Sequence, residues 1–312
     1  MAAKLSGVPE LSIRSWERRY SALTPHRTDS NRRLYSDKEI EKLVLLRKLI
    51  QFGHNIGNLA SLSINNLTDL LGKSEINNAF VKGKVLDAET SEDYLTLLNE
   101  CIDCIRKYDD KQLELILNDA SVKFTQPKLI ESIILPLMKK VGDYWKEGLL
   151  RVSHEHFTSV VIRKLLSNLS DGYLVNESAP RIVVTTPEGQ YHEIGAIVGT
   201  TLAASEGWQT TFLGASLPAE DIASAVKQLN SQCIFLSIVY PDDDPSINIQ
   251  LRKLRELAGE NVFILISGRA AHAYKRAITE INAHLINTPS HFRELLQIIR
   301  KQINPNNGAS NE

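Results

Sequence analysis

Three patterns along the chain predict a multidomain protein of mixed α and α/β class. The first seventy residues are locally basic and follow a helix–turn–helix pattern, a middle stretch holds four helical patterns, and the remainder alternates apolar β-branched runs with helical ones. We therefore expect a winged helix-turn-helix, a four-helix bundle and a flavodoxin-like domain of the Rossmann type. The expected boundaries are 1–71 for the helix-turn-helix, 72–90 for a linker, 91–172 for the bundle, 179–303 for the α/β domain and 304–312 for a disordered tail.

Length, charge and cysteine content narrow the class of protein. With 312 residues, 43% of them hydrophobic and 23% charged, the chain can build two or three cores. The net charge is only −1, yet residues 1–48 hold eleven Lys and Arg against six Asp and Glu. Three cysteines cannot make a disulfide scaffold, and no apolar run approaches the ~20 residues of a membrane span. We expect a cytoplasmic protein without a membrane partner, whose basic end meets a polyanion.

The amino-terminal pattern is that of a DNA-reading helix followed by a wing. After a turn at residues 7–9, the helix expected at 11–20 places Trp16 on its inner face. The polar, basic stretch 24–35 suits a two-stranded wing, and residues 36–39 form a capping box for the next helix. Because the second helix of such a motif enters the major groove, we expect DNA contacts in this region. The candidates are Arg14, Arg18, Arg19, Arg27, Arg32, Arg33 and Tyr35.

Within this set Arg18 and Arg33 are the best candidates for phosphate or base contact, whereas Trp16 and Tyr35 suit the core better. This region resembles the MerR family of winged-helix transcriptional regulators. The resemblance rests on SGVPELSIRSWERRY at 6–20 and RTDSNRRLYSDKEIEKLVLLRKLIQFGHNIGNLASL at 27–62. It implies binding to promoter DNA. The family normally has a few more residues before Ala3, so a shortened amino-terminal end is expected.

The middle of the chain is predicted to hold a linker and then a helical bundle. Residues 63–91 lack a sustained period and are rich in Asn, Gly, Lys and Asp, so we expect a linker with one short helix. The third and fourth helices would form a hairpin that brings Trp145 near Glu155 and His156. On composition alone these are a core aromatic residue and a helix-start acid, although such a group could also cover a flat ligand. The four helices are expected at 94–108, 111–120, 128–146 and 153–169.

The carboxyl-terminal pattern predicts five strand–helix units. In the strand order 2-1-3-4-5 the first and third strands flank the switch point, where ligands lie outside the carboxyl ends of a parallel sheet. His192 follows the first strand, Ser237 and Val239 lie at the end of the third, and Ser267-Gly268 end the fourth. An imidazole on such a loop can reach a ligand or a metal, although a lone histidine is more often a surface residue. The strands are expected at 182–186, 209–213, 233–239, 262–266 and 284–287.

These loops resemble the cobalamin-binding domain, whose motif runs Asp/Glu-x-His-x-x-Gly, then Ser-x-Leu, then Gly-Gly. The counterparts in this chain are Gln190, His192, Gly195, Ser237, Val239, Ser267 and Gly268. The resemblance implies that His192 is the lower axial ligand of cobalt, that Ser237 hydrogen-bonds the nucleotide tail, and that two glycines floor its slot. Gln190 replaces the carboxylate that would hydrogen-bond the second imidazole nitrogen. Gln190 can accept that bond but brings no charge, and Ser267 adds side-chain atoms where the tail must pass.

A tryptophan followed ten positions later by Glu-His resembles the helical domain of adenosylcobalamin-dependent MerR-type photoreceptor regulators (the CarH/LitR group). In that group these side chains shelter the adenosyl group, so the resemblance implies the same role for Trp145, Glu155 and His156. Light-responsive members can carry a histidine directly after the tryptophan, which replaces a cobalt ligand after photolysis. This chain has Lys146 there.

Together these resemblances imply a regulator and not an enzyme. The expected function is a transcriptional repressor whose self-association, as a dimer or tetramer, and affinity for promoter DNA depend on adenosylcobalamin and light. One alternative, favoured by Gln190, Ser267 and Lys146, is a cobalamin-independent repressor that uses the same domains for protein contacts. Another is a corrinoid-carrying methyltransferase subunit, against which the helix-turn-helix pattern argues.

Overall fold

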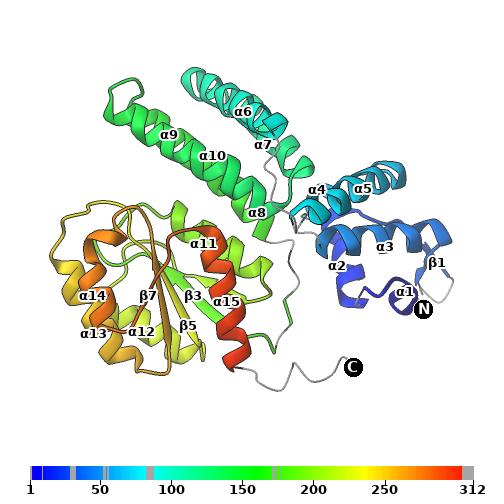
Figure 1. The fold of residues 1–312 in the computed structure, drawn as a ribbon. Coiled ribbons are helices and arrows are strands. Elements are labelled where there is room, and N and C mark those ends of the chain that lie inside the picture. Colours follow the sequence, from blue (N-terminus) through cyan, green and yellow to red (C-terminus); the bar gives the residue numbers. More distant parts are fainter. Residues whose placement is uncertain are drawn as a thin grey trace. The chain divides into compact units, whose positions relative to one another are not determined.

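A computed structural model describes residues 2–8, 10–28, 33–51, 54, 56–81, 88–170, 173, 175–176 and 178–303. The chain forms two compact units, Met1–Gly172 and Tyr173–Glu312 (Figure 1). The expected tail at 304–312 and the candidate DNA contact Arg32 lie outside the described residues. No helix among the described residues has the length and apolar character needed to cross a membrane.

The first unit begins with the predicted helix-turn-helix and wing. Trp16 is 5% exposed and lies in the same apolar core as Leu43 and Leu46, which confirms its assignment to the core. The two wing strands are antiparallel, with His26 opposite Leu34. The elements are α1 (Ala2–Ser6), α2 (Glu10–Tyr20), β1 (His26–Arg27), β2 (Arg33–Leu34), α3 (Asp37–Gln51), α4 (Ile56–Leu59) and α5 (Ile64–Val81).

Local sequence signals predict the start of α3 correctly but do not predict the length of α5. The capping box of α3 is present, because Glu39 Oε2 accepts the Ser36 N–H at 2.8 Å and Ser36 Oγ accepts the Glu39 N–H at 3.4 Å. By contrast, α5 is an 18-residue helix where a linker with one short helix was expected. Leu67 and Leu71, one turn apart, are buried in the amino-terminal core. This packing outweighs the weak helix propensity of the Asn and Gly residues around them.

The remainder of the first unit is the predicted helical bundle. The third helix is interrupted near Pro136, which lacks an N–H and cannot complete the regular ladder, so that one turn is π-helical. Cys101 and Cys104 are buried on a helix face, and burial raises the pKa of the Cys101 thiol to about 12. The elements are α6 (Ala88–Lys107), α7 (Asp110–Lys123), α8 (Gln126–Leu129), η1 (Ile130–Ile134), α9 (Leu135–Lys146) and α10 (Val152–Ser170).

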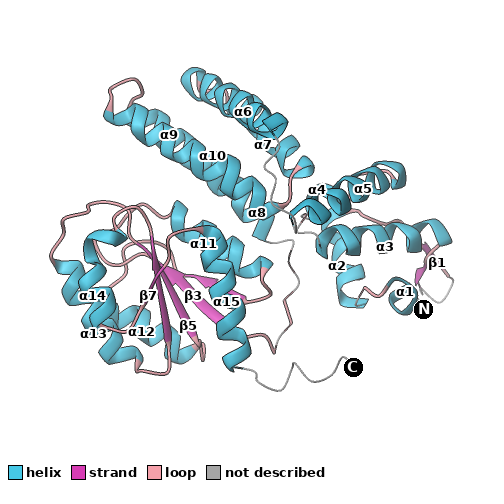
Figure 2. Cartoon of the chain, viewed as in Figure 1, coloured by secondary structure: helices cyan, strands magenta, loops and turns pink. Residues whose placement is uncertain are grey.

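The second unit is a doubly wound α/β domain with a parallel five-stranded sheet (Figure 2). The strand order β4-β3-β5-β6-β7 is the predicted order 2-1-3-4-5, with the switch point between β3 and β5. The elements are β3 (Arg181–Thr185), α11 (Ile194–Ser205), β4 (Gln209–Phe212), α12 (Ala219–Gln228), β5 (Cys233–Ser237), α13 (Ser246–Ala258), β6 (Phe263–Ser267), η2 (Ala271–Tyr274), α14 (Lys275–Glu280), β7 (His284–Leu285) and α15 (Pro289–Ile303).

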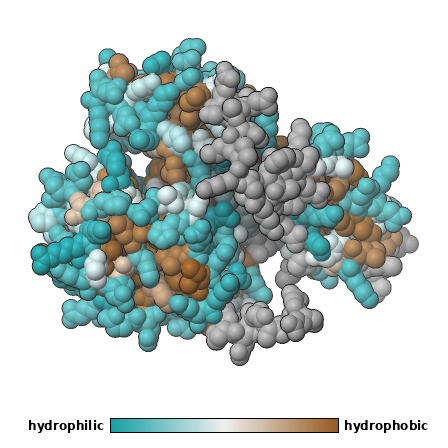
Figure 3. All heavy atoms as spheres, viewed as in Figure 1, coloured by the Kyte–Doolittle hydropathy of each residue, from teal (hydrophilic) through white to brown (hydrophobic). Residues whose placement is uncertain are grey.

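Each face of this sheet has its own apolar layer. In Figure 3 hydrophilic residues make up much of the coloured surface, with smaller hydrophobic patches between them. On one face, Ile234 and Ile264 pack with residues of α12 to α14. On the other, Phe235 packs against Phe292 with ring centroids 4.7 Å apart. A Cβ on Gly199 would lie 2.6 Å from the Phe235 ring, so α11 lies unusually close to the sheet. This close approach holds the middle of α11 against β5, C-terminal to the loop that bears His192.

Candidate functional site

The first candidate site is the loop between β3 and α11, residues 186–193, which we call the histidine loop. His192 lies at its end, directly before Glu193, the residue that caps α11, and its side chain is exposed. The imidazole lies edge-on to the ring of Tyr240, with centroids 6.1 Å apart and planes at 81°. His192 therefore lies outside the carboxyl end of the sheet at the switch point, where a ligand can reach it.

The loop after β4 holds the histidine loop on one side. The Oγ1 of Thr186 donates to Gln190 O and accepts the N–H of Ser216 at 2.7 Å. In return, the Oγ of Ser216 accepts the N–H of Gly189 at 3.0 Å. Gly189 has φ +85°, a left-handed conformation that glycine adopts without steric cost. These bonds restrict the backbone on which His192 is carried.

The side chain of Gln190 connects the histidine loop to the loop after β5. It is 1% exposed, and its Oε1 accepts the N–H groups of Val239 at 2.9 Å and Tyr240 at 3.0 Å. Its Nε2 donates to Pro241 O at 3.1 Å. Both lone pairs of the amide oxygen are thus used. In this structure the side chain of Gln190 therefore bonds to the loop after β5 and not to the His192 imidazole.

Gly195, Ser237 and Val239 are brought together at the switch point. A Cβ on Gly195 would lie 2.4 Å from Ser237 Oγ and 4.0 Å from Val239 Cγ2. Ser237 is 1% exposed, and its hydroxyl has no hydrogen-bond partner among the described residues. A buried hydroxyl without a partner is uncommon in native proteins and calls for an explanation such as an absent ligand. The close approach of Gly195 places this hydroxyl at the first turn of α11.

Ser267 and Gly268 end the neighbouring strand β6, where Ser267 pairs with Ser237 in the sheet. The Ser267 Oγ donates to Ile286 O at 3.3 Å, so its hydroxyl bonds to the chain just beyond β7. Gly268 has φ +110°, and a Cβ there would lie 2.2 Å from Ile238 O. The backbone of Ile238 is enough to require a glycine at this position. A role for Gly268 as the floor of a ligand slot stays a prediction.

The second candidate site is the turn between α9 and α10 in the first unit. Trp145, in the last turn of α9, is 42% exposed, an unusual state for a side chain of this size. In the first turns of α10, Glu155 Oε1 accepts the hydroxyl of Ser159 at 3.0 Å, whereas the side chain of His156 is 74% exposed. The His156 Nδ1 lies 3.8 Å from Glu155 Oε2. The helical hairpin thus places all three predicted residues at its closed end.

Sequence reasoning missed the residues that support this hairpin. The ring of Tyr108, which follows α6, stacks on His154 with centroids 4.3 Å apart and planes at 20°. Its hydroxyl lies 2.6 Å from Ser153 Oγ, and His154 Nδ1 accepts the N–H of Arg151 at 3.0 Å. The one available signal was a second histidine two positions before His156. Tyr240 was also missed, since no motif marks the residue that meets His192.

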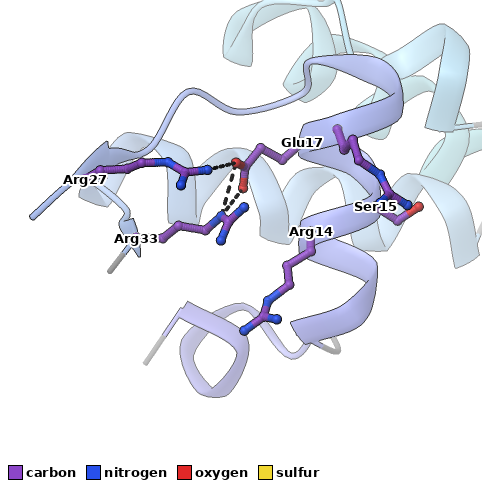
Figure 4. A pocket seen from close by; sticks show the side chains of 6 residues that line it. Arg14, Ser15, Glu17, Arg27 and Arg33 are labelled. Carbon is purple, nitrogen blue, oxygen red and sulfur yellow. Dashed lines mark hydrogen bonds and ion pairs between the residues drawn. The ribbon is translucent and has the colours of Figure 1, made fainter. Parts of the chain in front are cut away.

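The third candidate site is the basic surface of α2 and the wing, where Glu17 joins the two. Arg33 Nε donates to Glu17 Oε2 at 2.8 Å and Oε1 at 3.1 Å, and the Tyr35 hydroxyl donates to Oε2 at 3.4 Å. The bond to Glu17 raises the pKa of the Arg33 guanidinium. Arg27 Nη2 lies 3.9 Å from Oε1 of the same carboxylate, and Figure 4 shows both arginines directed at it. Arg33 and Tyr35 therefore orient the wing.

The remaining predicted DNA contacts lie on α2. Arg14, Arg18 and Arg19 are exposed, and Arg14 pairs with Glu10 one turn earlier. Arg14, Arg18 and the two wing arginines line one open hollow together with Ser15 and Glu17 (Figure 4). Such a concentration of guanidinium groups beside a helix that can enter a groove suits contact with phosphates.

Parts of the chain match three sequence families. Residues 1–62 match the MerR HTH family of regulatory proteins, and residues 97–170 and 180–287 each match a B12 binding domain. One relative is the HTH-type transcriptional repressor CarH of Myxococcus xanthus, 27% identical over 91% of this chain and 93% of the relative. Another is the repressor CarA of the same organism, 26% identical over 76% of this chain and 74% of the relative.

Among solved structures, the monomethylamine corrinoid protein of Methanosarcina barkeri has a TM-score of 0.53 and 16% identity, and the match covers 65% of this chain and 99% of that one. This likeness shows a shared fold. The order of the domains, a DNA reader followed by a helical and then an α/β B12-binding part, agrees with the geometry described above. The chain thus combines a MerR-type helix-turn-helix domain with two regions that match B12 binding domains.

Proposed function

We propose that this chain is a transcriptional repressor that binds adenosylcobalamin, and that the cofactor controls self-association and hence the affinity for promoter DNA. The matches to a MerR helix-turn-helix and to B12-binding domains support the general assignment, and two relatives are named transcriptional repressors. We infer the adenosyl form of the cofactor, the response to light and the assembly from the site residues and from the resemblance to photoreceptor regulators.

The residues of the second unit fit a cobalamin. His192 offers an exposed imidazole on a loop held by hydrogen bonds on both sides, as an axial ligand of cobalt requires. The hydroxyl of Ser237 is buried without a partner and can hydrogen-bond the nucleotide tail. Gly195 lies directly against this hydroxyl, and Ser267 is paired with Ser237 on the neighbouring strand. This orphaned hydroxyl beside the histidine loop is the observation that carries the proposal.

The residues of the helical hairpin have the chemistry to contact an adenosyl group. A half-exposed indole at Trp145 can cover the planar adenine, while Glu155 and His156 can hydrogen-bond its ribose. When bound, adenosylcobalamin would supply a cobalt–carbon bond that green or blue light breaks. Loss of the adenosyl group would leave Trp145 and Glu155 without their contact. Lys146 stands directly after Trp145, where light-responsive members can carry a histidine, and offers an amine and not an imidazole.

Self-association would link the cofactor to DNA. One helix-turn-helix with a few phosphate contacts binds weakly at physiological salt, whereas two or four joined copies gain affinity through multivalency. A ligand that favours the assembled form therefore raises the affinity for DNA, with a coupling of about 1–3 kcal/mol in typical allosteric proteins. In this account the dark, adenosyl-bound form represses, and illumination releases the DNA.

The test is gel filtration of the full chain with adenosylcobalamin, in the dark and after green light, followed by binding of each fraction to a promoter fragment from its own gene region. We expect a larger, corrinoid-containing species in the dark that binds the fragment tightly, and a smaller one after illumination. Cyanocobalamin serves as the control without an adenosyl group. Equal size and equal DNA binding in all conditions would contradict cofactor control.

One observation favours a second candidate, a cobalamin-independent MerR-type repressor. The position of the usual carboxylate holds Gln190, and its amide is bonded to the loop after β5 and brings no charge to the imidazole. In that case the domains would serve protein contacts. Tight DNA binding by the cofactor-free chain, with no corrinoid retained on gel filtration, would support this candidate over the first.

A further inference from the structure

The loop after β5, residues 238–245, has a fixed arrangement beside the histidine loop. Beyond its bonds to Gln190, the N–H of Asp244 donates to the Tyr274 hydroxyl at 3.0 Å, and Asp244 Oδ1 accepts the N–H of Ser246 at 2.9 Å. The loop is thus tied near both of its ends. Tyr240 projects from its first half, is 52% exposed, and meets the His192 ring edge-on.

The side chain of Gln190 matches this loop in a way that few residues could. Two successive N–H groups, of Val239 and Tyr240, converge on its Oε1, and a carbonyl, of Pro241, accepts from its Nε2. The loop therefore offers two donors and one acceptor to one side chain. An amide supplies an acceptor and a donor on two neighbouring atoms, whereas an ionised carboxylate only accepts and an aliphatic side chain does neither.

An ionised glutamate at position 190 could not form the same hydrogen bonds with the loop after β5. One carboxylate oxygen could still accept from the two N–H groups, but the second would face Pro241 O at the present donor–acceptor distance of 3.1 Å. Two acceptors so close, in a site 1% exposed, repel each other and lose the hydrogen bond between them. Replacing the amide by the carboxylate should therefore release the loop that carries Tyr240.

We propose that Gln190 is a positioning residue for His192, acting through the loop that carries Tyr240 and not through a bond to the imidazole. The amide holds the loop, the loop holds the Tyr240 ring, and the ring limits the directions that the His192 imidazole can take. The expected effect on cobalt binding rests on the proposed cobalamin site, because the direction of the imidazole sets how well cobalt is bound. The arrangement of Gln190, Tyr240 and His192 is independent of that site.

The two possible roles of Gln190 predict opposite effects of one substitution. If Gln190 faced the imidazole, Gln190→Glu would supply the stronger acceptor and tighten cobalamin binding. If Gln190 holds the loop, the same change weakens binding. Gln190→Leu removes all three bonds with a similar volume and should act in the same direction. Gln228→Glu, an equal change of charge at an exposed position of α12, is the matched control.

The first measurement uses the cofactor-free full chain. The His192 imidazole resonances are assigned by comparison with His192→Ala, and the ring-current shift from Tyr240 is calibrated with Tyr240→Leu. We expect Gln190→Glu and Gln190→Leu to move the His192 resonances toward their positions in Tyr240→Leu, and the amide hydrogens of Val239 and Tyr240 to exchange at least about tenfold faster. His192 resonances that stay at the wild-type positions in both variants would overturn the proposal.

The second measurement is the dark affinity for adenosylcobalamin of each variant, alone and combined with His192→Ala. We expect Gln190→Glu to weaken binding about tenfold, the size of effect typical of residues that support a metal ligand, and to have no further effect once His192 is absent. Binding by Gln190→Glu equal to or tighter than wild type overturns the proposal. Wild-type protein that binds no cobalamin instead contradicts the proposed function, while the resonance experiment still tests the positioning of His192.

Discussion

The α carbon of Gly195 lies so close to Ser237 that a Cβ there would be 2.4 Å from the Ser237 Oγ. Gly195→Ala should therefore force α11 away from β5, with a loss of unfolding free energy of about 1–3 kcal/mol. Denaturant unfolding of the cofactor-free chain measures this loss. The double variant Gly195→Ala/Ser237→Gly should recover most of it. Equal stability of Gly195→Ala and wild type would show that the two elements are not in close contact.

Ser237→Ala should separate stability from cofactor binding. The buried hydroxyl has no hydrogen-bond partner among the described residues, so its removal costs nothing and can stabilise the cofactor-free chain by up to about 1 kcal/mol. The same change removes the group assigned to the nucleotide tail and should weaken cobalamin binding about tenfold. Thermal unfolding and a binding titration test both effects. If Ser237→Ala destabilises the free chain, the hydroxyl already has a partner.

His54 should make the first unit sensitive to mild acid. Burial lowers the pKa of His54 to about 4, below the value of about 6.5 expected in the unfolded chain. The unfolded chain thus binds the proton first, and the unfolding free energy falls as pH drops from 6.5 towards 4, by about 3 kcal/mol in all. His54→Gln should flatten this dependence. His156→Gln, whose side chain is 74% exposed, is the control that should leave the slope unchanged.

The α2 arginines should contribute to DNA binding through phosphates. Arg18→Ala removes an exposed charge from the basic hollow and should weaken binding to all sequences, lowering the slope of log affinity against log salt by about 1. Arg106→Ala, an equal charge change on the bundle, should leave the slope unchanged. Filter binding at several salt concentrations measures the slopes. A slope that stays at the wild-type value in Arg18→Ala would place the DNA elsewhere.

Trp145→Ala should affect the cofactor more than the fold. The indole is 42% exposed, so its loss should change the unfolding free energy by about 1 kcal/mol or less. Dark affinity for adenosylcobalamin should fall at least about tenfold because the adenosyl group loses its aromatic cover, whereas affinity for cyanocobalamin should change little. Leu149→Ala, 59% exposed in the adjoining turn, is the control. Equal losses for both cobalamins would argue against contact with the adenosyl group.

Much of the fold could be predicted because its signals are local. The capping box at Ser36 and Glu39, the alternating strand–helix pattern, and the glycine before α2 depend on neighbouring residues, and the structure has them all. The length of α5 was missed because Leu67 and Leu71 are held by a core formed elsewhere in the chain. Helix propensity does not include such packing.

Part of the arrangement at the candidate site could be predicted from the topology. Gly195 and Ser237 lie together because the strand order places β3 next to β5, whereas the role of these residues and of His192 in binding a ligand stays a prediction. The partners of Gln190 could not be predicted, since its amide bonds to a loop some fifty residues away whose backbone direction no motif encodes. The contact between Tyr240 and His192 could not be predicted for the same reason. Hydrogen bonds between loops depend on coordinates that a pattern of residue types does not contain.

The central claim is that His192 binds the cobalt of a cobalamin. Its most direct test is the visible absorption spectrum of the purified chain mixed with adenosylcobalamin in the dark, recorded for wild type and His192→Ala after gel filtration. The account predicts that wild type retains a corrinoid whose spectrum differs from that of the free cofactor, and that His192→Ala retains little or gives the spectrum of a cobalamin without an imidazole ligand. The same spectrum and the same retained amount in both proteins would contradict it.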